Sequence, residues 1–372
     1  MRIGIDAREL CGHATGVGRY LGGLLREWSI DARARVHEFV LYAPEPIALP
    51  LDARRFPSRT IAGSGRTWWE QVQVPHAVTS DHLDVWFAPA YTAPLRLNAR
   101  TVVAIHDLSF IAHPEWFRLR EGARRRWLTR QAASRAATVI TISEFSKREL
   151  VDRLGVPAHK IQVIPPGIGA GVVELGTTGS VSSPSPQSLA PSPYRVLFVG
   201  SIFNRRHVID LIRAFAPIAR QHPEAALDIV GDDRSYPRED LRAAIGAEQL
   251  ETQVQWHKYV TDEQLKALYA GARAFAFLSE YEGLGLTPLE ALAAGIPPVL
   301  LDTAVARESC GDAAVYVAAR DLPATTRALE TMLFDDAARR PILAAAPAAL
   351  SKYSWPRAAR ETLAVIEAAG SG

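Results

Sequence analysis

Two glutamates, Glu282 and Glu290, stand with seven residues between them in a stretch that also holds paired glycines and a proline. An apolar run typical of a buried strand, residues 274–278, precedes this stretch, and a helical pattern follows it. Thr287 fits the N-cap of that helix, with Pro288 at its first position. Strand, glycine-rich loop and helix in this order direct backbone N–H groups and a helix N-terminus at one point. Such a point suits an anionic ligand, for example a phosphate.

The run from Ser279 to Ala291 resembles the Glu-x7-Glu motif of the retaining glycosyltransferases of family 4, which have the two-domain GT-B fold. The resemblance implies that Glu290 hydrogen-bonds the ribose hydroxyls of a nucleotide-sugar donor, and that Glu282 lies near the donor sugar. It also implies that the loop backbone contacts the sugar hydroxyls and the phosphate. That loop consists of Gly283, Leu284, Gly285 and Leu286. The alternative for Glu290 is a capping-box carboxylate that only closes its own helix.

Length and composition fit a two-domain globular protein. The 372 residues can form two cores, and 48% apolar with 22% charged residues is ordinary for soluble proteins. The formal net charge of +2 says little about partners. Cys11 and Cys310 are far apart and lack a metal-ligand pattern, so we expect no disulfide framework and a reducing cytoplasm. The N-terminus reaches a polar residue too early for a signal peptide, and we expect no membrane-spanning segment.

Short apolar runs alternate with helical patterns in both halves of the chain, which predicts two parallel α/β sheets with right-handed crossovers. Strands are expected at residues 3–5, 39–42, 85–88, 102–105, 138–142, 162–164, 195–199, 226–230, 254–256, 274–278 and 298–301. Because such sheets bind ligands beyond the carboxyl ends of their strands, the cleft between two facing domains is the expected active site.

The fold class that the resemblance implies is α/β GT-B, with two facing Rossmann-like domains. Residues 1–168 would form the acceptor-binding domain and residues 194–352 the donor-binding domain. Residues 169–193, rich in Ser and Pro, are expected to form a flexible linker. Residues 353–372 would form a C-terminal helix that crosses back to the first domain, although a simple terminal helix fits the sequence equally well.

Gly16 and Gly18 follow the first strand and resemble the glycine loop of the family, which lets the backbone approach the donor diphosphate. Physically, paired glycines remove the side chains that would keep a phosphate away. Leu21 occupies the position of the third glycine in a dinucleotide fingerprint, so a nicotinamide-dinucleotide site is a poor interpretation. A plain loop leading into a helix is the alternative.

His106 and Asp107 follow the strand at residues 102–105, at the edge of the sheet where cleft chemistry is expected. They resemble the His-Asp motif of the family, which implies that His106 lies near O6 of the donor sugar or near the acceptor. A structural histidine is the alternative. A metal-dependent His-Asp phosphohydrolase would need further ligands at suitable spacing, and the sequence offers none, so no metal site is predicted.

Arg205 and Arg206 follow the first strand of the second domain, where the family commonly has Arg-Lys. The resemblance implies that the second position neutralises the donor phosphates, and Arg206 keeps that charge while adding a bidentate fork. Tyr259 and Val260 resemble the loop that cradles the base of the donor. We therefore predict His106, Glu282 and Arg206 as catalytic residues and the others as donor-binding residues.

Seven arginines lie between Arg118 and Arg135, with Trp116, Phe117 and Trp127 among them. A solvated helix face explains this pattern as well as a functional role does. The functional alternative is contact with anionic lipid headgroups, which would make the protein peripheral on the inner face of the cytoplasmic membrane, or with a lipid-diphosphate acceptor. Nucleic acid is a weaker partner, because the basic charge is local and no nucleic-acid motif accompanies it.

The resulting prediction is a retaining, metal-independent hexosyltransferase in cell-surface polysaccharide biosynthesis, which needs no cofactor. It would move a glycosyl group from a nucleoside-diphosphate sugar to a hydroxyl of a glycan or lipid-linked acceptor. GDP-mannose is the favoured donor, with UDP- or dTDP-sugars close behind. A nucleotide-sugar 2-epimerase of the same fold and a non-catalytic nucleotide-sugar-binding protein stay open. A glycoside hydrolase also needs two carboxylates, but a loop residue and a helix residue are poorly placed to flank one bond.

Overall fold

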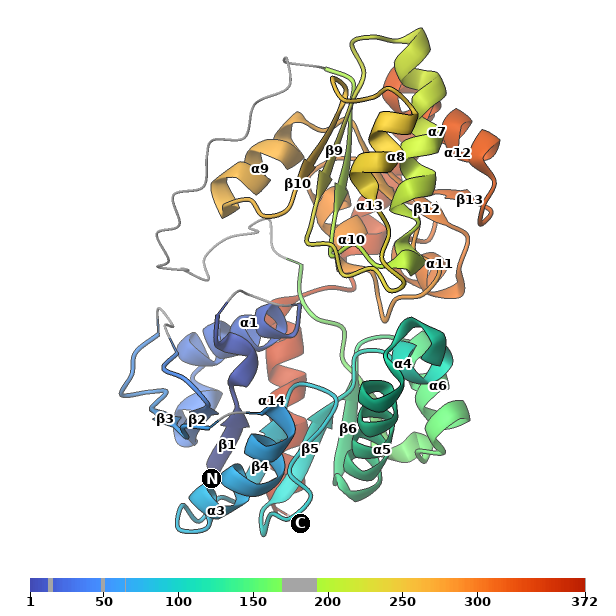
Figure 1. Cartoon of the computed structure of the whole chain (residues 1–372). Coiled ribbons are helices and arrows are strands. Elements are labelled where there is room, and N and C mark those ends of the chain that lie inside the picture. Colours follow the sequence, from blue (N-terminus) through green and yellow to red (C-terminus); the bar gives the residue numbers. More distant parts are fainter. Residues whose placement is uncertain (13–15, 48–50, 64, 169–192, 372) are drawn as a thin grey trace. The chain divides into compact units, whose positions relative to one another are not determined.

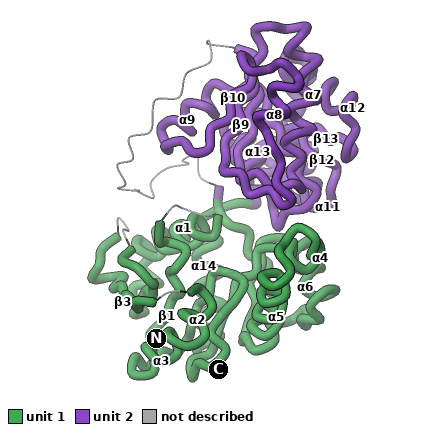
Figure 2. The backbone as a smooth tube through the Cα atoms, viewed as in Figure 1, with its two compact units in different colours: residues 1–167, 175–181, 353–372 green, residues 168–174, 182–352 purple. Residues whose placement is uncertain are grey.

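The computed structural model describes residues 1–12, 16–47, 51–63, 65–168 and 193–371, and it divides into two compact units (Figure 2). The described part of the first unit runs from Met1 to Gly167 and from Tyr353 to Ser371, and that of the second from Ile168 to Lys352, each without the gaps above. Most of the expected linker, residues 169–192, lies outside the described residues.

The first unit is built on a parallel sheet with strand order β3-β2-β1-β4-β5-β6-β7 (Figure 1). The strands are β1 (Arg2–Asp6), β2 (Glu38–Ala43), β3 (Ser58–Thr60), β4 (Val85–Ala88), β5 (Arg100–Ala104), β6 (Thr138–Thr141) and β7 (Ile161–Val163). The order reverses between β1 and β4, and such a switch point opens a crevice at the carboxyl ends of the strands.

The helices of the first unit cover both faces of its sheet. They are α1 (Gly16–Ile30), α2 (Arg66–Trp68), α3 (Val74–Val78), α4 (Ser109–Ala112), α5 (Leu119–Arg135), α6 (Glu144–Leu154) and α14 (Trp355–Ser371). Successive side chains of a β-strand point to opposite faces of the sheet. The residues of each buried strand therefore pack alternately into the cores on the two faces. In β2, Phe39 and Leu41 pack with α1 and α14, whereas Val40 and Tyr42 pack in the core on the other face.

The chain returns to the first unit through α14, which packs against α1. Trp355 at its start lies so close to Gly23 of α1 that a Cβ on Gly23 would come within 2.5 Å of the indole. A second glycine, Gly167, would meet the same residue at 2.2 Å. Glycine at both positions therefore makes room for the indole, and the helix that packs on the first unit comprises residues 355–371.

The second unit has a parallel sheet with strand order β10-β9-β8-β11-β12-β13. Its strands are β8 (Arg195–Val199), β9 (Ala226–Val230), β10 (Val254–His257), β11 (Ala274–Phe277), β12 (Pro298–Leu301) and β13 (Val315–Val317). Its helices are α7 (Val208–Gln221), α8 (Leu241–Ala247), α9 (Asp262–Gly271), α10 (Leu286–Ala293), α11 (Ala304–Cys310), α12 (Leu322–Phe334) and α13 (Asp336–Leu350). Here the order reverses between β8 and β11, so a ligand crevice is expected where these two strands end.

Eleven of the strands lie where the apolar runs predict them, with ends that differ by at most two residues. The sequence reading missed the short strands β3 and β13. All three residues of β3 are exposed, and β13 has one buried residue. Neither strand therefore produces the continuous apolar run that marks a buried parallel strand.

Candidate functional site

Several predicted site residues of the second unit lie at its switch point, on the loops that follow β8 and β11. Arg205 and Arg206 lie in a short 3-10 turn after β8, and Glu282 lies in the loop after β11. The backbone joins the two loops, because the Glu280 N–H donates to the Arg205 carbonyl oxygen at 2.9 Å. Sheet topology thus brings together side chains that are 76 residues apart in sequence.

Arg206 and Glu282 form an ion pair at the centre of this site. Arg206 Nε donates to Glu282 Oε1 at 2.8 Å, and Arg206 Nη1 donates to the Ser201 carbonyl oxygen at 2.8 Å. The guanidinium carbon of Arg206 lies 4.9 Å from the ring centre of Phe277, which fixes its plane. Ser279 Oγ donates to the same carboxylate oxygen at 2.9 Å. The arginine is therefore held in place before any ligand arrives.

The ionisation of Glu282 depends on these neighbours. Burial works to raise the pKa of its carboxyl, but the charges of Arg206 and Arg205 and the hydrogen bonds from Arg206 and Ser279 outweigh burial, so the pKa lies below its usual range. Arg205 Nη2 lies 4.0 Å from Glu282 Oε1, and Arg205 Nε donates to the Tyr281 carbonyl oxygen at 3.1 Å. A carboxylate that stays ionised in this way is unsuited to act as a general acid.

Helix α10 (Leu286–Ala293) begins two residues earlier than the sequence predicts. Its N-cap is Gly285, which has φ of 86°, a left-handed conformation that favours glycine. The prediction that Thr287 caps this helix is therefore wrong, and no side chain caps it. Glu290 accordingly lies beyond the third helical position, so it is no capping-box partner. The N–H groups of the first turn of an α-helix have no acceptor within the helix, and this turn directly follows the loop that carries Glu282.

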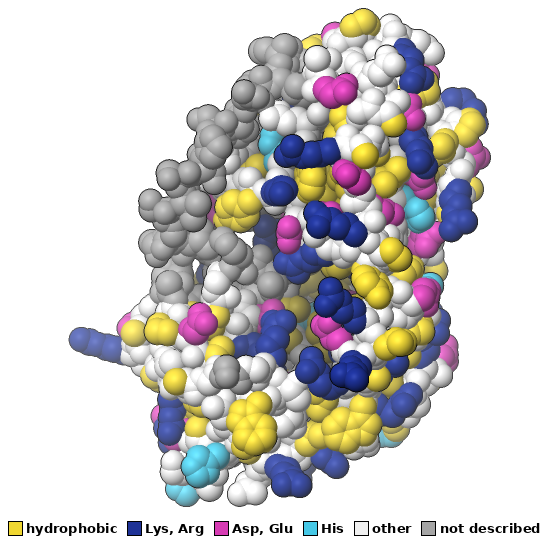
Figure 3. All heavy atoms as spheres, viewed as in Figure 1, with side chains coloured by type: hydrophobic (Ala, Val, Ile, Leu, Met, Phe, Trp, Pro, Cys, Tyr) yellow, Lys and Arg dark blue, Asp and Glu magenta, His cyan; other side chains and the backbone are white. Residues whose placement is uncertain are grey.

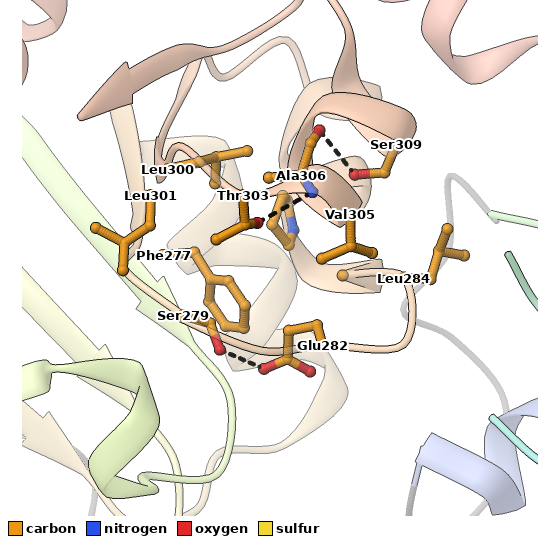
Figure 4. A pocket seen from close by; sticks show the side chains of 12 residues that line it. Phe277, Ser279, Glu282, Leu284, Leu300, Leu301, Thr303, Val305, Ala306 and Ser309 are labelled. Carbon is orange, nitrogen blue, oxygen red and sulfur yellow. Dashed lines mark hydrogen bonds between the residues drawn. The ribbon is translucent and has the colours of Figure 1, made fainter. Parts of the chain in front are cut away.

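Figure 4 shows the small pocket that these elements enclose within the second unit. Its lining comprises Phe277, Ser279, Glu282, Leu284, Gly285, Pro288, Leu300, Leu301, Thr303, Val305, Ala306 and Ser309. Ser279 and Glu282 come from the loop after β11, and Thr303 with its successors from the start of α11. Sequence reasoning missed Ser201, Ser279 and Thr303. Of these three residues, only Ser279 could have been proposed from the sequence, because it begins the run that carries Glu282 and Glu290.

Glu290 lies on α10 and is half-buried. The hydroxyl of Tyr269, a buried residue of α9, donates to Glu290 Oε2 at 3.2 Å. Tyr259 is 60% exposed and Val260 follows it in the loop before α9. That helix begins with a capping box between Thr261 and Gln264, which sets where the loop ends.

His106 lies in the first unit, two residues beyond β5 and nearly fully buried. Burial lowers the pKa of its imidazole, against an opposing hydrogen bond to the Pro89 carbonyl oxygen at 2.8 Å from Nε2. Because a carbonyl oxygen can only accept, the proton of the neutral ring lies on Nε2 and leaves Nδ1 as an acceptor. The rings of Tyr20 and Tyr91 contact it edge-on at 4.8 and 5.7 Å.

Gly16 and Gly18 also belong to the first unit, but they do not form a loop. Both lie in the first turn of α1, which corrects the prediction of a glycine loop at these positions. This segment is helical because Tyr20, Leu21 and Leu24 lie at helical spacing and supply a buried face. Residues 13–15, which precede this turn, lie outside the described residues.

The comparisons with known proteins cover almost the whole chain. Residues 14–170 match the model for Glycosyltransferase Family 4, and residues 183–347 match the model for Glycosyl transferases group 1. Among curated proteins, the O-antigen chain mannosyltransferase B of Escherichia coli is 26% identical over 75% of this chain and 73% of its own length. The glycogen synthase of Mycobacterium tuberculosis is 28% identical over 83% of this chain and 72% of its own length.

Solved structures of the same fold are similar over their full lengths. HepE of Anabaena, solved in complex with UDP and glucose, has a TM-score of 0.75 at 18% identity and covers 98% of this chain and 99% of its own. WaaG, a glycosyltransferase involved in lipopolysaccharide biosynthesis, has a TM-score of 0.71 at 17% identity with the same coverage. The fold is therefore GT-B, and the chain belongs to the family 4, group 1 glycosyltransferases.

Proposed function

We propose that this glycosyltransferase moves a glycosyl group, with mannosyl favoured, from a nucleoside-diphosphate sugar to a hydroxyl of a glycan or lipid-linked acceptor, with retention of configuration. The observation that carries the proposal is the cluster of Arg205, Arg206 and the first turn of α10 at one switch point. Two cations and a helix N-terminus at one place suit a diphosphate. The mannosyl preference rests on relatives such as the GDP-mannose:cellobiosyl-diphosphopolyprenol alpha-mannosyltransferase of Xanthomonas oryzae, 29% identical over 47% of this chain.

Each residue has a role in this proposal. Arg206 and Arg205 bind the diphosphate, and the backbone from Gly283 to Leu286 assists them. Glu290 accepts hydrogen bonds from the ribose hydroxyls, and the loop at Tyr259 and Val260 holds the base. Glu282 orients the sugar, since its carboxylate stays ionised beside Arg206. His106 would act near the donor sugar or the acceptor, and Gly16 and Gly18 would let the backbone approach the diphosphate.

The proposed reaction is a displacement on one face of the donor sugar. The bond from the anomeric carbon to the diphosphate oxygen breaks while the bond to the acceptor oxygen forms on the same face of the sugar. The departing phosphate oxygen takes the proton of the acceptor hydroxyl, so no separate general base is needed. Arg205, Arg206 and the amides of α10 stabilise the charge that develops on the leaving group. Charge-assisted hydrogen bonds contribute on the order of 1.5–3 kcal/mol each, so several together can act in place of a metal.

A single assay tests the proposal against its alternatives. The protein is incubated with GDP-mannose, UDP-glucose or dTDP-glucose, with and without acceptors, and nucleoside diphosphate release is followed. We expect release that depends on an acceptor, and a product whose anomeric configuration, read by NMR, matches that of the donor. Release of free nucleotide with a rearranged sugar and no acceptor would identify a 2-epimerase. Binding without release would identify a non-catalytic protein.

The same assay carries a prediction about metals. We expect the rate to change by less than about twofold when a chelator is added, because arginines and amides supply the charge that a metal would otherwise supply. The control is a nucleotide-sugar enzyme known to need a divalent cation, which the same chelator must inactivate. A rate that collapses in chelator and recovers with Mg²⁺ or Mn²⁺ would contradict the metal-free mechanism.

We also propose that the exposed face of α5 contacts the inner face of the cytoplasmic membrane. Arg120, Arg124 and Arg130 on this helix are exposed, and Leu119 and Trp127 are 85% and 56% exposed. In Figure 3, basic and hydrophobic side chains lie next to each other over this part of the first unit. Arginine beside exposed tryptophan and leucine suits an anionic lipid surface. Across the described residues, no helix is long and apolar enough to cross a membrane.

Vesicle sedimentation tests this contact. Wild-type protein is expected to sediment with vesicles of phosphatidylglycerol and phosphatidylcholine, and to stay in solution with phosphatidylcholine alone. Replacing both Arg120 and Arg124 with glutamine should weaken binding by about 30-fold, since each basic residue near an anionic surface contributes about 1 kcal/mol. The matched control is Arg220→Gln, a change at an exposed arginine of α7 in the second unit. Equal sedimentation of all three proteins would refute the contact.

A further inference from the structure

Arg125 on α5 is a half-buried cation that the surrounding side chains leave charged. Its guanidinium carbon lies 4.5 Å from the ring centre of Tyr91, 4.3 Å from that of Phe110 and 5.9 Å from that of Phe117. Within the described ranges, no carboxylate forms an ion pair with Arg125 and no acceptor takes a hydrogen bond from it. Aromatic faces stabilise the charge without using the N–H donors, which lie at the edges of the guanidinium plane. The donors therefore stay available for a ligand.

Two neighbouring carboxylates, Asp107 and Glu121, do not compete for this cation. Asp107 accepts hydrogen bonds from the Tyr91 hydroxyl at 2.6 Å, from the Ser109 hydroxyl at 2.6 Å and from the Ser109 N–H at 2.8 Å. Glu121 lies one turn before Arg125 on an exposed position of α5. Because Asp107 is held by three other donors, a ligand that binds Arg125 need not displace it.

Tyr91, one of the three rings around Arg125, lies at the same edge of the sheet as His106. Tyr91 follows β4, and its ring contacts both the Arg125 guanidinium and the His106 imidazole. Tyr91 has φ of 59°, and its N–H donates to the Ala104 carbonyl oxygen at 2.8 Å. A tyrosine with positive φ costs on the order of 1–3 kcal/mol, and such residues cluster at functional sites. The Tyr91 ring therefore contacts both Arg125, whose N–H donors are available, and His106, which we place near the reacting groups.

We propose that Arg125 binds a phosphate of a lipid-diphosphate acceptor. The proposal rests on the proposed function, because it names the acceptor class of that reaction. A planar guanidinium held flat by rings presents two N–H groups to two phosphate oxygens, which an ammonium group cannot do. The exposed Arg120, Arg124 and Arg130 face lipid headgroups, whereas Arg125 takes the diphosphate of the acceptor. Because the Tyr91 ring contacts both Arg125 and His106, a diphosphate on Arg125 would lie on the side of the first unit where we place the hydroxyl that receives the sugar.

Binding of farnesyl diphosphate tests this assignment, with farnesol as the uncharged probe. Saturating GDP and UDP are present throughout, so that the diphosphate site of the second unit is occupied. We expect Arg125→Gln to weaken farnesyl diphosphate binding by at least about 10-fold, the loss of one charge-assisted pair. Farnesol binding should not change. The control Arg220→Gln, at an exposed arginine of α7, should alter farnesyl diphosphate binding by less than about twofold.

Two further measurements make the result decisive. Arg125→Lys keeps the charge and loses the planar fork, so it should weaken binding several-fold while the Tm stays that of the wild type. If Arg125→Gln fails to fold, the farnesyl diphosphate affinity of Arg125→Lys tests the proposal instead. Unchanged farnesyl diphosphate affinity in folded Arg125 variants would overturn the proposal, and loss of vesicle binding alone would assign Arg125 to headgroups instead. If no nucleotide sugar is consumed yet binding still depends on Arg125, the proposed reaction fails and the phosphate site stands.

Discussion

Glu290→Ala is expected to weaken nucleoside diphosphate binding by about 100-fold, or about 2.7 kcal/mol, in a protein that remains folded. In the proposed complex its carboxylate accepts hydrogen bonds from two ribose hydroxyls, and each such bond to a charged group contributes on the order of 1.5–3 kcal/mol. Part of this binding free energy is offset. The Tyr269 hydroxyl, which lies 3.2 Å from Glu290 Oε2, is released in the variant and forms a hydrogen bond with water instead. Calorimetry with GDP and with UDP measures the loss.

Tyr269→Phe is the matched control for this experiment. It removes only the hydroxyl that contacts Glu290 and keeps the buried ring, which stacks against Phe275. We expect a change of less than about threefold in nucleotide affinity, because Tyr269 positions the carboxylate without touching the ligand. An unaltered affinity in folded Glu290→Ala would remove Glu290 from the ribose site. Its contact with Tyr269 would then be structural.

Arg206→Ala is expected to lower kcat by at least about 10-fold, which corresponds to about 1.4 kcal/mol of barrier. The guanidinium would stabilise the charge on the leaving diphosphate, and it is already fixed by Glu282, by the Ser201 carbonyl and by Phe277. Arg206→Lys should retain part of the rate. A single ammonium group cannot hold Glu282 and Ser201 and also bind phosphate in a bidentate manner. Steady-state kinetics with saturating donor give the comparison.

The effect of Arg206→Ala on protein stability has to be separated from its effect on kcat. Removing Arg206 leaves the largely buried Glu282 carboxylate with Ser279 and a distant Arg205. A buried charge that loses its partner typically costs 3–5 kcal/mol. The double variant Arg206→Ala with Glu282→Gln removes that unpaired charge, so we expect its Tm to recover while kcat stays low. Full activity in the folded single variant would exclude Arg206 from the phosphate site.

The strands could be predicted because buried parallel strands are apolar on both faces. Runs such as residues 195–199 and 274–277 therefore appear in the sequence as short apolar blocks. The exposed edge strand β3 has no such block. The start of α10 was misplaced for a different reason. Its cap depends on the left-handed backbone of Gly285, whereas the sequence also offered Thr287 as an ordinary cap.

The sequence by itself determined the α/β pattern, the family and the identity of the motif residues, because apolar periodicity and short motifs are local properties of the chain. Tertiary structure alone decided which of these residues meet. Arg206 and Glu282 are brought together only by the reversal of strand order between β8 and β11. Arg125 likewise looks like one more arginine in a basic helix until the fold places Tyr91 and Phe110 over its guanidinium. Contacts between distant segments depend on strand order and helix packing, and these are properties of the whole unit.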